Sequence, residues 1–207
     1  MKVLSIYNHP VETLGTISEY IDGISIQGQD IKGNEEFDSL IIMGGPQSVY
    51  ESENYPYIRK EMDLVRKAYT KGKRVLGICL GSQIASEALG GKVIRGPYGS
   101  EIGVQKVRTI GKFSFLGDEI KVFQMHSDTF SLPPGSELLA YSEKYFQAFK
   151  KGSVLGIQFH VEVTPEIVDK WVSVYGMNKE LVDQVQEVKV DLKKNVGKIM
   201  DFWFNMT

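Results

Sequence analysis

Short apolar runs alternate with amphipathic stretches in the N-terminal part of the chain. The apolar runs have the length of buried strands and end in turn or glycine residues; they occupy 3–7, 39–43 and 75–78. Apolar residues recur at helical spacing after each run, over 12–21, 57–71 and 80–89. Because strands that alternate with helices form parallel sheets covered on both faces, this order predicts an α/β fold.

The middle of the chain changes to short strand-like runs separated by turns, at 92–94, 103–107, 120–125 and 138–142. These runs predict a mixed or antiparallel extension, and the apolar run 154–159 predicts one more buried strand. From Asn178 onward, apolar residues recur at steps of three and four, which favours a long helix packed on the sheet over a partner-binding helix. We therefore expect a single domain over 1–207, a three-layer sandwich with a mostly parallel central sheet flanked by helices.

Composition narrows the classes of function. Apolar residues make up 42% and charged residues 24%, and 24 basic residues nearly balance 26 acidic ones. No basic run interleaved with aromatics points to nucleic acid or a membrane surface, so small-molecule chemistry is favoured. The N-terminus lacks a signal-peptide pattern, and we expect a cytoplasmic protein. The three histidines and the lone cysteine show no ligand spacing, so neither a metal site nor a cofactor is predicted.

That cysteine, Cys79, lies where an apolar strand is expected to turn into a helix. Residues 77–81 read Gly-Ile-Cys-Leu-Gly, the G-x-Nuc-x-G form of a nucleophile elbow, in which glycines let neighbouring backbone approach a tight turn. The turn would leave the N–H of Leu80 free to stabilise a thiolate or an oxyanion. The alternative is a small buried hydrophobe, which is the commoner role of a lone cysteine.

A base for this thiol is available at the end of the apolar run 154–159. His160 follows that run, and Glu162 lies two residues further, on the same side of an extended chain. A carboxylate in that position can fix the imidazole tautomer and stabilise the imidazolium. The alternative is a strand-end histidine beside a solvated glutamate. Reactive groups of parallel sheets gather at the carboxyl ends of strands, where Cys79 and His160 are both expected, which favours the catalytic interpretation.

Residues 77–83 and 156–162 together resemble the class I (triad) glutamine amidotransferases. Supporting matches extend over most of the chain, at 43–46, 99–103 and 125–128. The resemblance is greatest to stand-alone, GMP-synthase-like members, which carry a histidine loop after the first strand, here 8–10, and a segment like 126–128. It implies the flavodoxin-like fold of that family.

The resemblance also implies a reaction. Cys79 would attack the side-chain amide of glutamine, His160 would protonate the departing ammonia, and water would resolve a γ-glutamyl thioester. It further implies an oxyanion hole formed by the backbone N–H groups of Gly45 and Leu80. The substrate-binding residues that it implies are Gln83, Glu101, His126 and Asp128. For Glu101 an exposed loop carboxylate is an equal alternative, and His126, like His9, has the alternative of a loop histidine with satisfied hydrogen bonds.

Three positions depart from the family pattern. Val161 stands where proline is common, Ser82 stands where many members have histidine, and Ser127 replaces the usual glycine. Val161 leaves open the backbone conformation between His160 and Glu162. Ser82 leaves open the substrate preference, and Ser127 leaves open the path of its loop.

Three functions remain open. The sequence has no G-x-x-x-x-G-K-[ST] loop that would activate an acceptor with ATP, so we do not expect a complete synthetase. The first hypothesis is a glutaminase that passes ammonia to a separate synthetase subunit. The second is a free-standing hydrolase of γ-glutamyl peptides or related amides. The third, a non-catalytic binding module, is disfavoured because Cys79, His160 and Glu162 are all present.

Overall fold

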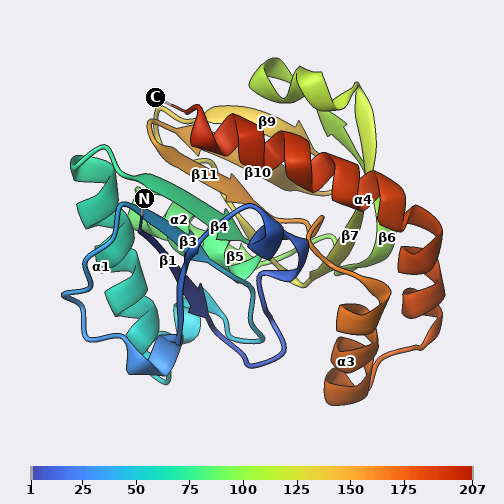
Figure 1. The fold of residues 1–207 in the computed structure, drawn as a ribbon, viewed down its shortest axis with the longest axis horizontal. Coiled ribbons are helices and arrows are strands. Elements are labelled where there is room, and N and C mark those ends of the chain that lie inside the picture. The colour runs from blue at the N-terminus through green and yellow to red at the C-terminus, as the bar shows by residue number, and fades with distance from the viewer. Residues whose placement is uncertain (1, 207) are drawn as a thin grey trace.

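The computed structural model describes residues 2–206, and its main sheet has a parallel and an antiparallel half (Figure 1). Neighbouring strands are parallel in the order β2 (Gly23–Gln27), β1 (Val3–Tyr7), β3 (Ser39–Ile42), β4 (Arg74–Ile78) and β11 (Val154–Ile157). The antiparallel half continues through β10 (Phe146–Lys151), β9 (Glu137–Tyr141), β6 (Glu101–Thr109) and β7 (Glu119–His126). A separate antiparallel pair consists of β5 (Val93–Arg95) and β8 (Asp128–Phe130). The predicted parallel sheet with an antiparallel extension is confirmed.

Helices cover both faces of this sheet. One face packs against α1 (Pro56–Thr70) and α2 (Leu80–Ala88). The other packs against α4 (Glu180–Phe204), which crosses the sheet in Figure 1 and contacts α3 (Pro165–Tyr175). Short 3₁₀ helices occur in the connections, η1 (Gly15–Glu19), η2 (Gly28–Asp30), η3 (Val49–Glu51) and η4 (Gly111–Leu116). The predicted three-layer sandwich is therefore confirmed.

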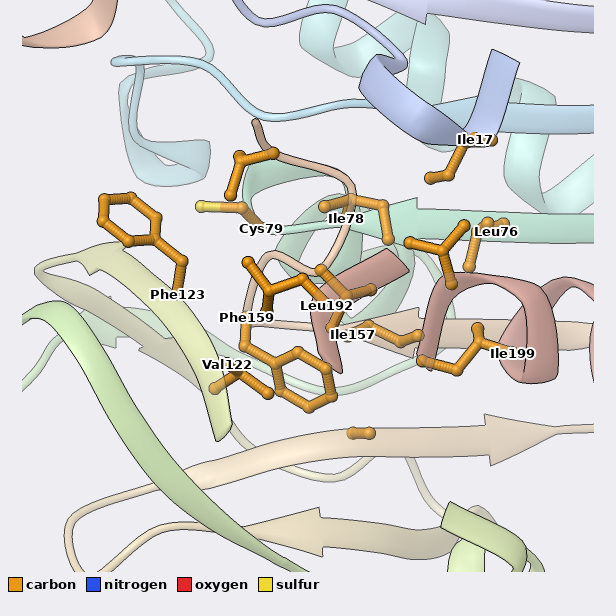
Figure 2. Packing of buried hydrophobic residues seen from close by; sticks show 14 of the residues in the cluster. Ile17, Leu76, Ile78, Cys79, Val122, Phe123, Ile157, Phe159, Leu192 and Ile199 are labelled. Carbon is orange, nitrogen blue, oxygen red and sulfur yellow. The ribbon is translucent and has the colours of Figure 1, made fainter. Parts of the chain in front are cut away.

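The alternation of side chains along the central strands produces two cores. Val75 of β4 belongs to the cluster under α1 and α2, whereas its neighbour Leu76 belongs to the cluster under α4. Figure 2 shows Leu192 and Ile199 of α4 among the side chains of this second cluster, and both are fully buried. The predicted packing of the C-terminal helix on its own sheet is thus confirmed. Among residues 2–206, no helix has the length and apolar character needed to cross a membrane.

The helix predicted over residues 12–21 is wrong. The structure has only the 3₁₀ turn η1 there, although Leu14 and Ile17 are buried as their spacing suggested. Gly15 has a φ of 52°, and a Cβ on it would lie 2.2 Å from the backbone oxygen of Glu162. This close tertiary approach replaces an α-helix with a tight turn. The chain then enters the edge strand β2. This strand was not predicted from the sequence, and neither was β10 or α3.

Glu61 is a residue of α1, and its carboxyl group is fully buried. Neither of its oxygens has a hydrogen-bond partner within residues 2–206. Burial raises the pKa of Glu61 to about 8, although Asn8 acts in the opposite direction. Between the ordinary pKa of a glutamate and pH 8, the folded protein therefore retains a proton that the unfolded chain has released.

This difference makes stability depend on pH. Because the folded state binds the extra proton, the free energy of unfolding falls as pH rises towards 8, by an amount on the order of a few kcal/mol. We predict that Glu61→Gln flattens this dependence, since glutamine does not titrate. Urea denaturation of both proteins at pH 5.5, 6.5, 7.5 and 8.5 measures the two slopes, and equal slopes would contradict the assignment.

Candidate active site

Cys79 lies at the turn between β4 and α2 in a strained backbone conformation. Its φ of 52° and ψ of −110° make it the one non-glycine residue with a positive φ in the described chain. Such a conformation costs roughly 1–3 kcal/mol and persists only where the surrounding structure enforces it. Figure 2 shows the Cys79 side chain among the core residues, between Ile78 and Phe123. Cys79 also lines a cavity. The predicted strand-to-helix turn is confirmed.

The flanking glycines are required by close backbone contacts. A Cβ on Gly77 would lie 2.3 Å from the oxygen of Gly81, and a Cβ on Gly81 would lie 2.0 Å from the oxygen of Ile42. Neither contact leaves room for a side chain, because the obstructing atoms belong to the backbone. The elbow therefore joins α2 to both β4 and β3.

His160 and Glu162 form a buried pair beyond the end of β11. Nδ1 of His160 lies 2.7 Å from Oε1 of Glu162, and both residues are at most 1% exposed. The His160 backbone is held in a bridge with Phe123 of β7, with hydrogen bonds of 2.8 and 2.9 Å. The backbone oxygen of Glu162 accepts hydrogen bonds from the N–H and the hydroxyl of Thr16. Base and carboxylate are thus fixed from two directions.

The electrostatics of this pair favour a charged imidazole. Burial alone would lower the pKa of His160, but the charge of Glu162 and the neighbouring Cys79 outweigh burial and hold that pKa well above its ordinary value. Nε2 of His160 is buried without a hydrogen-bond partner in the described part of the chain. An imidazolium with a free N–H is suited to stabilise a thiolate and to pass a proton to a reacting group.

A cavity of about 330 Å³ opens beside the thiol at the carboxyl ends of β1, β3 and β4. Gly45 and Leu80, expected to supply oxyanion donors, both line it. Leu80 is the first residue of α2, so the helix itself provides no acceptor for its N–H. Gly45 approaches Leu80 closely, because a Cβ on Gly45 would lie 3.1 Å from the Leu80 side chain. Two backbone segments therefore meet next to Cys79.

The residues expected to bind substrate divide into two groups. Gln83, His126 and Asp128 line the cavity. Nε2 of Gln83 donates to the backbone oxygen of Asp128 at 3.3 Å, and Nδ1 of His126 lies 2.8 Å from the same oxygen. The Asp128 carboxylate accepts hydrogen bonds from the hydroxyls of Ser48 and Tyr50, at 2.6 and 3.1 Å. These three residues form one connected wall of the cavity.

Glu101, also expected to bind substrate, does not line that cavity but lies behind His126. Its carboxylate accepts hydrogen bonds from His126 Nε2 at 2.9 Å and from Gln147 Nε2 at 2.6 Å. Only 2% exposed, it is not a solvated loop acid either. Burial acts to raise the pKa of Glu101, but the hydrogen bonds, first that from His126, lower it below the ordinary value. Glu101 thus positions His126 from behind.

The three departures from the family pattern have structural consequences. The backbone N–H of Val161 donates to Oε2 of Glu162 at 3.0 Å, a hydrogen bond that a proline could not make. The Ser82 hydroxyl donates to the backbone oxygen of Cys79 at 2.7 Å, within the first turn of α2. Ser127 lies 2.7 Å from the hydroxyl of Ser100, which links its loop to the start of β6. Each polar group has a local partner.

Sequence reasoning missed Glu12 and Tyr175, which also line the cavity. Oε1 of Glu12 accepts a hydrogen bond from the Tyr175 hydroxyl at 3.1 Å. Burial raises the pKa of Glu12 to about 7, although His160 and Tyr175 act to lower it. Glu12 follows β1 at the carboxyl edge of the sheet, a position that could have indicated it. His9 lies instead beside a separate hollow, its ring 5.5 Å from that of Tyr175.

No cluster of three or more histidine, cysteine, aspartate or glutamate side chains suited to a metal ion occurs within residues 2–206.

Comparison with known proteins agrees with this arrangement. Residues 10–172 match the family model described as Glutamine amidotransferase class-I, so the chain belongs to the class I glutamine amidotransferases. It is similar to a solved glutamine amidotransferase structure from Thermotoga maritima, with a TM-score of 0.88, 29% identity and 97% of each chain covered.

Two curated relatives differ in how much of their length is matched. The glutamine-hydrolyzing GMP synthase of Aquifex aeolicus is 33% identical over 202 residues, which are 90% of this chain but 38% of that protein. Gamma-glutamyl peptidase 5 of Arabidopsis thaliana is 31% identical over 198 residues, 87% of this chain and 78% of the relative. The chain thus spans less than half of the synthase and most of the peptidase.

The elbow contacts predict a stability effect. We expect Gly81→Ala to lower the free energy of unfolding by about 2–4 kcal/mol, because its methyl group meets the backbone of Ile42. Gly197→Ala is the matched control: its methyl meets only the movable end of the Tyr20 side chain, in a helix that favours alanine. Chemical denaturation of both variants tests this, and equal stabilities would show that the elbow relaxes freely.

Proposed function

We propose that this chain hydrolyses the side-chain amide of glutamine through a γ-glutamyl thioester on Cys79. The observation that carries the proposal is the strained Cys79 at a cavity wall, which interacts with His160 of the buried His160–Glu162 pair. In this reading Cys79 is the nucleophile, His160 the base and acid, and Glu162 the group that orients and charges the imidazole. The relatives named as glutamine-hydrolyzing enzymes support the same chemistry.

The steps follow from the positions of these groups. The Cys79 thiolate attacks the γ-carbonyl carbon, and the resulting oxyanion accepts hydrogen bonds from the N–H groups of Gly45 and Leu80. The C–N bond then breaks as His160 gives its proton to the nitrogen, and ammonia leaves. A water molecule next gives a proton to His160 and attacks the thioester, which releases glutamate and restores the thiolate.

Substrate recognition is assigned to the connected wall of Gln83, His126 and Asp128. The hydrogen-bond donors and acceptors of these side chains suit the α-amino and α-carboxylate groups of a glutamyl substrate. Glu101 acts through His126 in this proposal rather than on the substrate. The relative named as a glutamine-hydrolyzing GMP synthase supports a synthetase subunit as the partner that uses the ammonia.

A second candidate function is hydrolysis of γ-glutamyl peptides or related amides without a partner. The observation that favours it is the match to most of the length of a gamma-glutamyl peptidase. Both functions use the same thioester, and they differ in the group that leaves.

The nucleophile assignment predicts that Cys79→Ala lowers kcat/KM for glutamate release by at least about 10³-fold, since no other group in the site can form the thioester. Ammonia and glutamate are measured with glutamine and with γ-glutamyl dipeptides in parallel. A preference for dipeptides selects the second candidate function. Release that survives in Cys79→Ala, or wild-type inactivity on both substrates with and without a synthetase, contradicts the proposal.

We expect the reactivity of the Cys79 thiol to depend on the charge of Glu162. Because this charge raises the pKa of His160, its removal in Glu162→Gln leaves burial to lower that pKa and weakens the positive charge beside Cys79. We expect the rate of Cys79 alkylation by iodoacetamide at pH 6.5 to fall by about tenfold or more. Mass spectrometry of the alkylated protein measures the rate, and an unchanged rate in the folded variant would remove Glu162 from this role.

A further inference from the structure

The proposed mechanism leaves one buried carboxyl of the cavity without a task. Glu12 is 3% exposed, lines the same cavity as Cys79, and has one side-chain hydrogen bond within the described residues, the one from Tyr175. A desolvated carboxylate that faces a cavity gains stability from any cationic or N–H-bearing group that binds next to it. Its neighbours decide which group that is.

Glu12 lies next to the base. A Cβ on Gly44 would lie 2.6 Å from Oε2 of Glu12 and 3.5 Å from Cε1 of His160, so the carboxyl and the imidazole flank the same glycine. A side chain at position 44 would push into the Glu12 carboxylate, and glycine keeps the two groups close.

Helix α3 fixes this arrangement. Trp171 packs edge-on against the His160 ring at 5.0 Å between centroids, and its indole N–H donates to the backbone oxygen of Val11 at 2.7 Å. Tyr175, one turn further along α3, holds the Glu12 carboxyl. One helix thus positions both the imidazole and the loop that carries Glu12.

The location of Glu12 indicates which part of a substrate it meets. The wall formed by Gln83, His126 and Asp128 is a separate, internally bonded group, to which Glu12 and Tyr175 make no hydrogen bond among residues 2–206. His160 delivers the proton to the departing nitrogen, so that nitrogen leaves on the side of His160, where Glu12 lies. The partly buried Met177, two residues beyond Tyr175, also lines this cavity.

We propose that Glu12 and Tyr175 form the subsite for the amine that leaves Cys79 and for an amine that attacks its thioester. The Glu12 carboxylate accepts a hydrogen bond from the amine nitrogen, and substituents on that nitrogen extend along Met177. The substrate class is then γ-glutamyl amides with a substituted nitrogen as well as glutamine. This inference rests on the proposed function of Cys79.

The aminolysis step is the reverse of acylation. The amine nitrogen forms a bond to the γ-carbonyl carbon and gives one proton to His160, while the C–S bond breaks and the Cys79 thiolate leaves. The products are a γ-glutamyl amide and the free enzyme, with no additional reactant. Water and amine therefore compete for one thioester.

This competition supplies the test. Wild type, Glu12→Gln and Tyr175→Phe are incubated with glutamine and methylamine, and mass spectrometry measures the ratio of γ-glutamylmethylamide to glutamate. We expect the ratio to fall by about tenfold in Glu12→Gln, the loss of one charge-assisted hydrogen bond, and by less in Tyr175→Phe. Glu61→Gln, a buried acid away from the cavity, is the matched control and keeps the wild-type ratio.

Both products come from the same active enzyme molecules. The ratio of amide to glutamate therefore does not depend on how much of a variant is folded. Tyr175→Phe keeps the test decisive if Glu12→Gln does not fold. An unchanged ratio in the variants, or no amide formed by wild type, overturns the subsite while Cys79-dependent glutamate release leaves the proposed function intact. Absence of Cys79-dependent release from every γ-glutamyl substrate overturns both.

Discussion

The close contact between backbone segments at the elbow is the constraint on which the site depends. Gly81 meets the backbone of Ile42, and Gly77 meets that of Gly81, at separations that exclude any side chain. These contacts bring β3, β4 and α2 together and force Cys79 into its positive φ. The thiol, the start of α2 and the glycine loop after β3 consequently meet at one cavity. Packing in the core thus supports a conformation that is unfavourable by itself.

A second set of contacts brings the base to this position from distant parts of the chain. The bridge to Phe123 joins His160 to the antiparallel half of the sheet, and Thr16 holds the backbone of Glu162. Helix α3 adds Trp171 and Tyr175, which connect the loop after β1 to the same imidazole. The two halves of the sheet and the N-terminal loop therefore depend on one another through His160. The charge on its imidazole is favoured by Glu162 and Cys79, which outweigh the opposing effect of burial.

The features that the sequence predicted are those with a local origin. The glycines around Cys79 and the spacing of His160 and Glu162 report on backbone within a few residues, and the structure has both arrangements. The position of Glu101 behind His126 was not predictable in this way, because the pairing of β6 with β7 sets it opposite His126, which local patterns do not reveal. Glu12 was missed because apolar spacing suggested a helix where Gly15 makes a tight tertiary turn. Thr164 and Gly176 are ordinary start and stop signals for α3, and they could have indicated the helix that carries Tyr175.

The central claim is that Cys79 carries the γ-glutamyl group, and its most direct test is acid quenching of the enzyme during turnover of glutamine, followed by peptide mass spectrometry. We expect a γ-glutamyl thioester, labile to hydroxylamine, on the peptide that contains Cys79. Steady formation of glutamate by the pure protein with no adduct on that peptide, or with the adduct on another residue, would contradict the account.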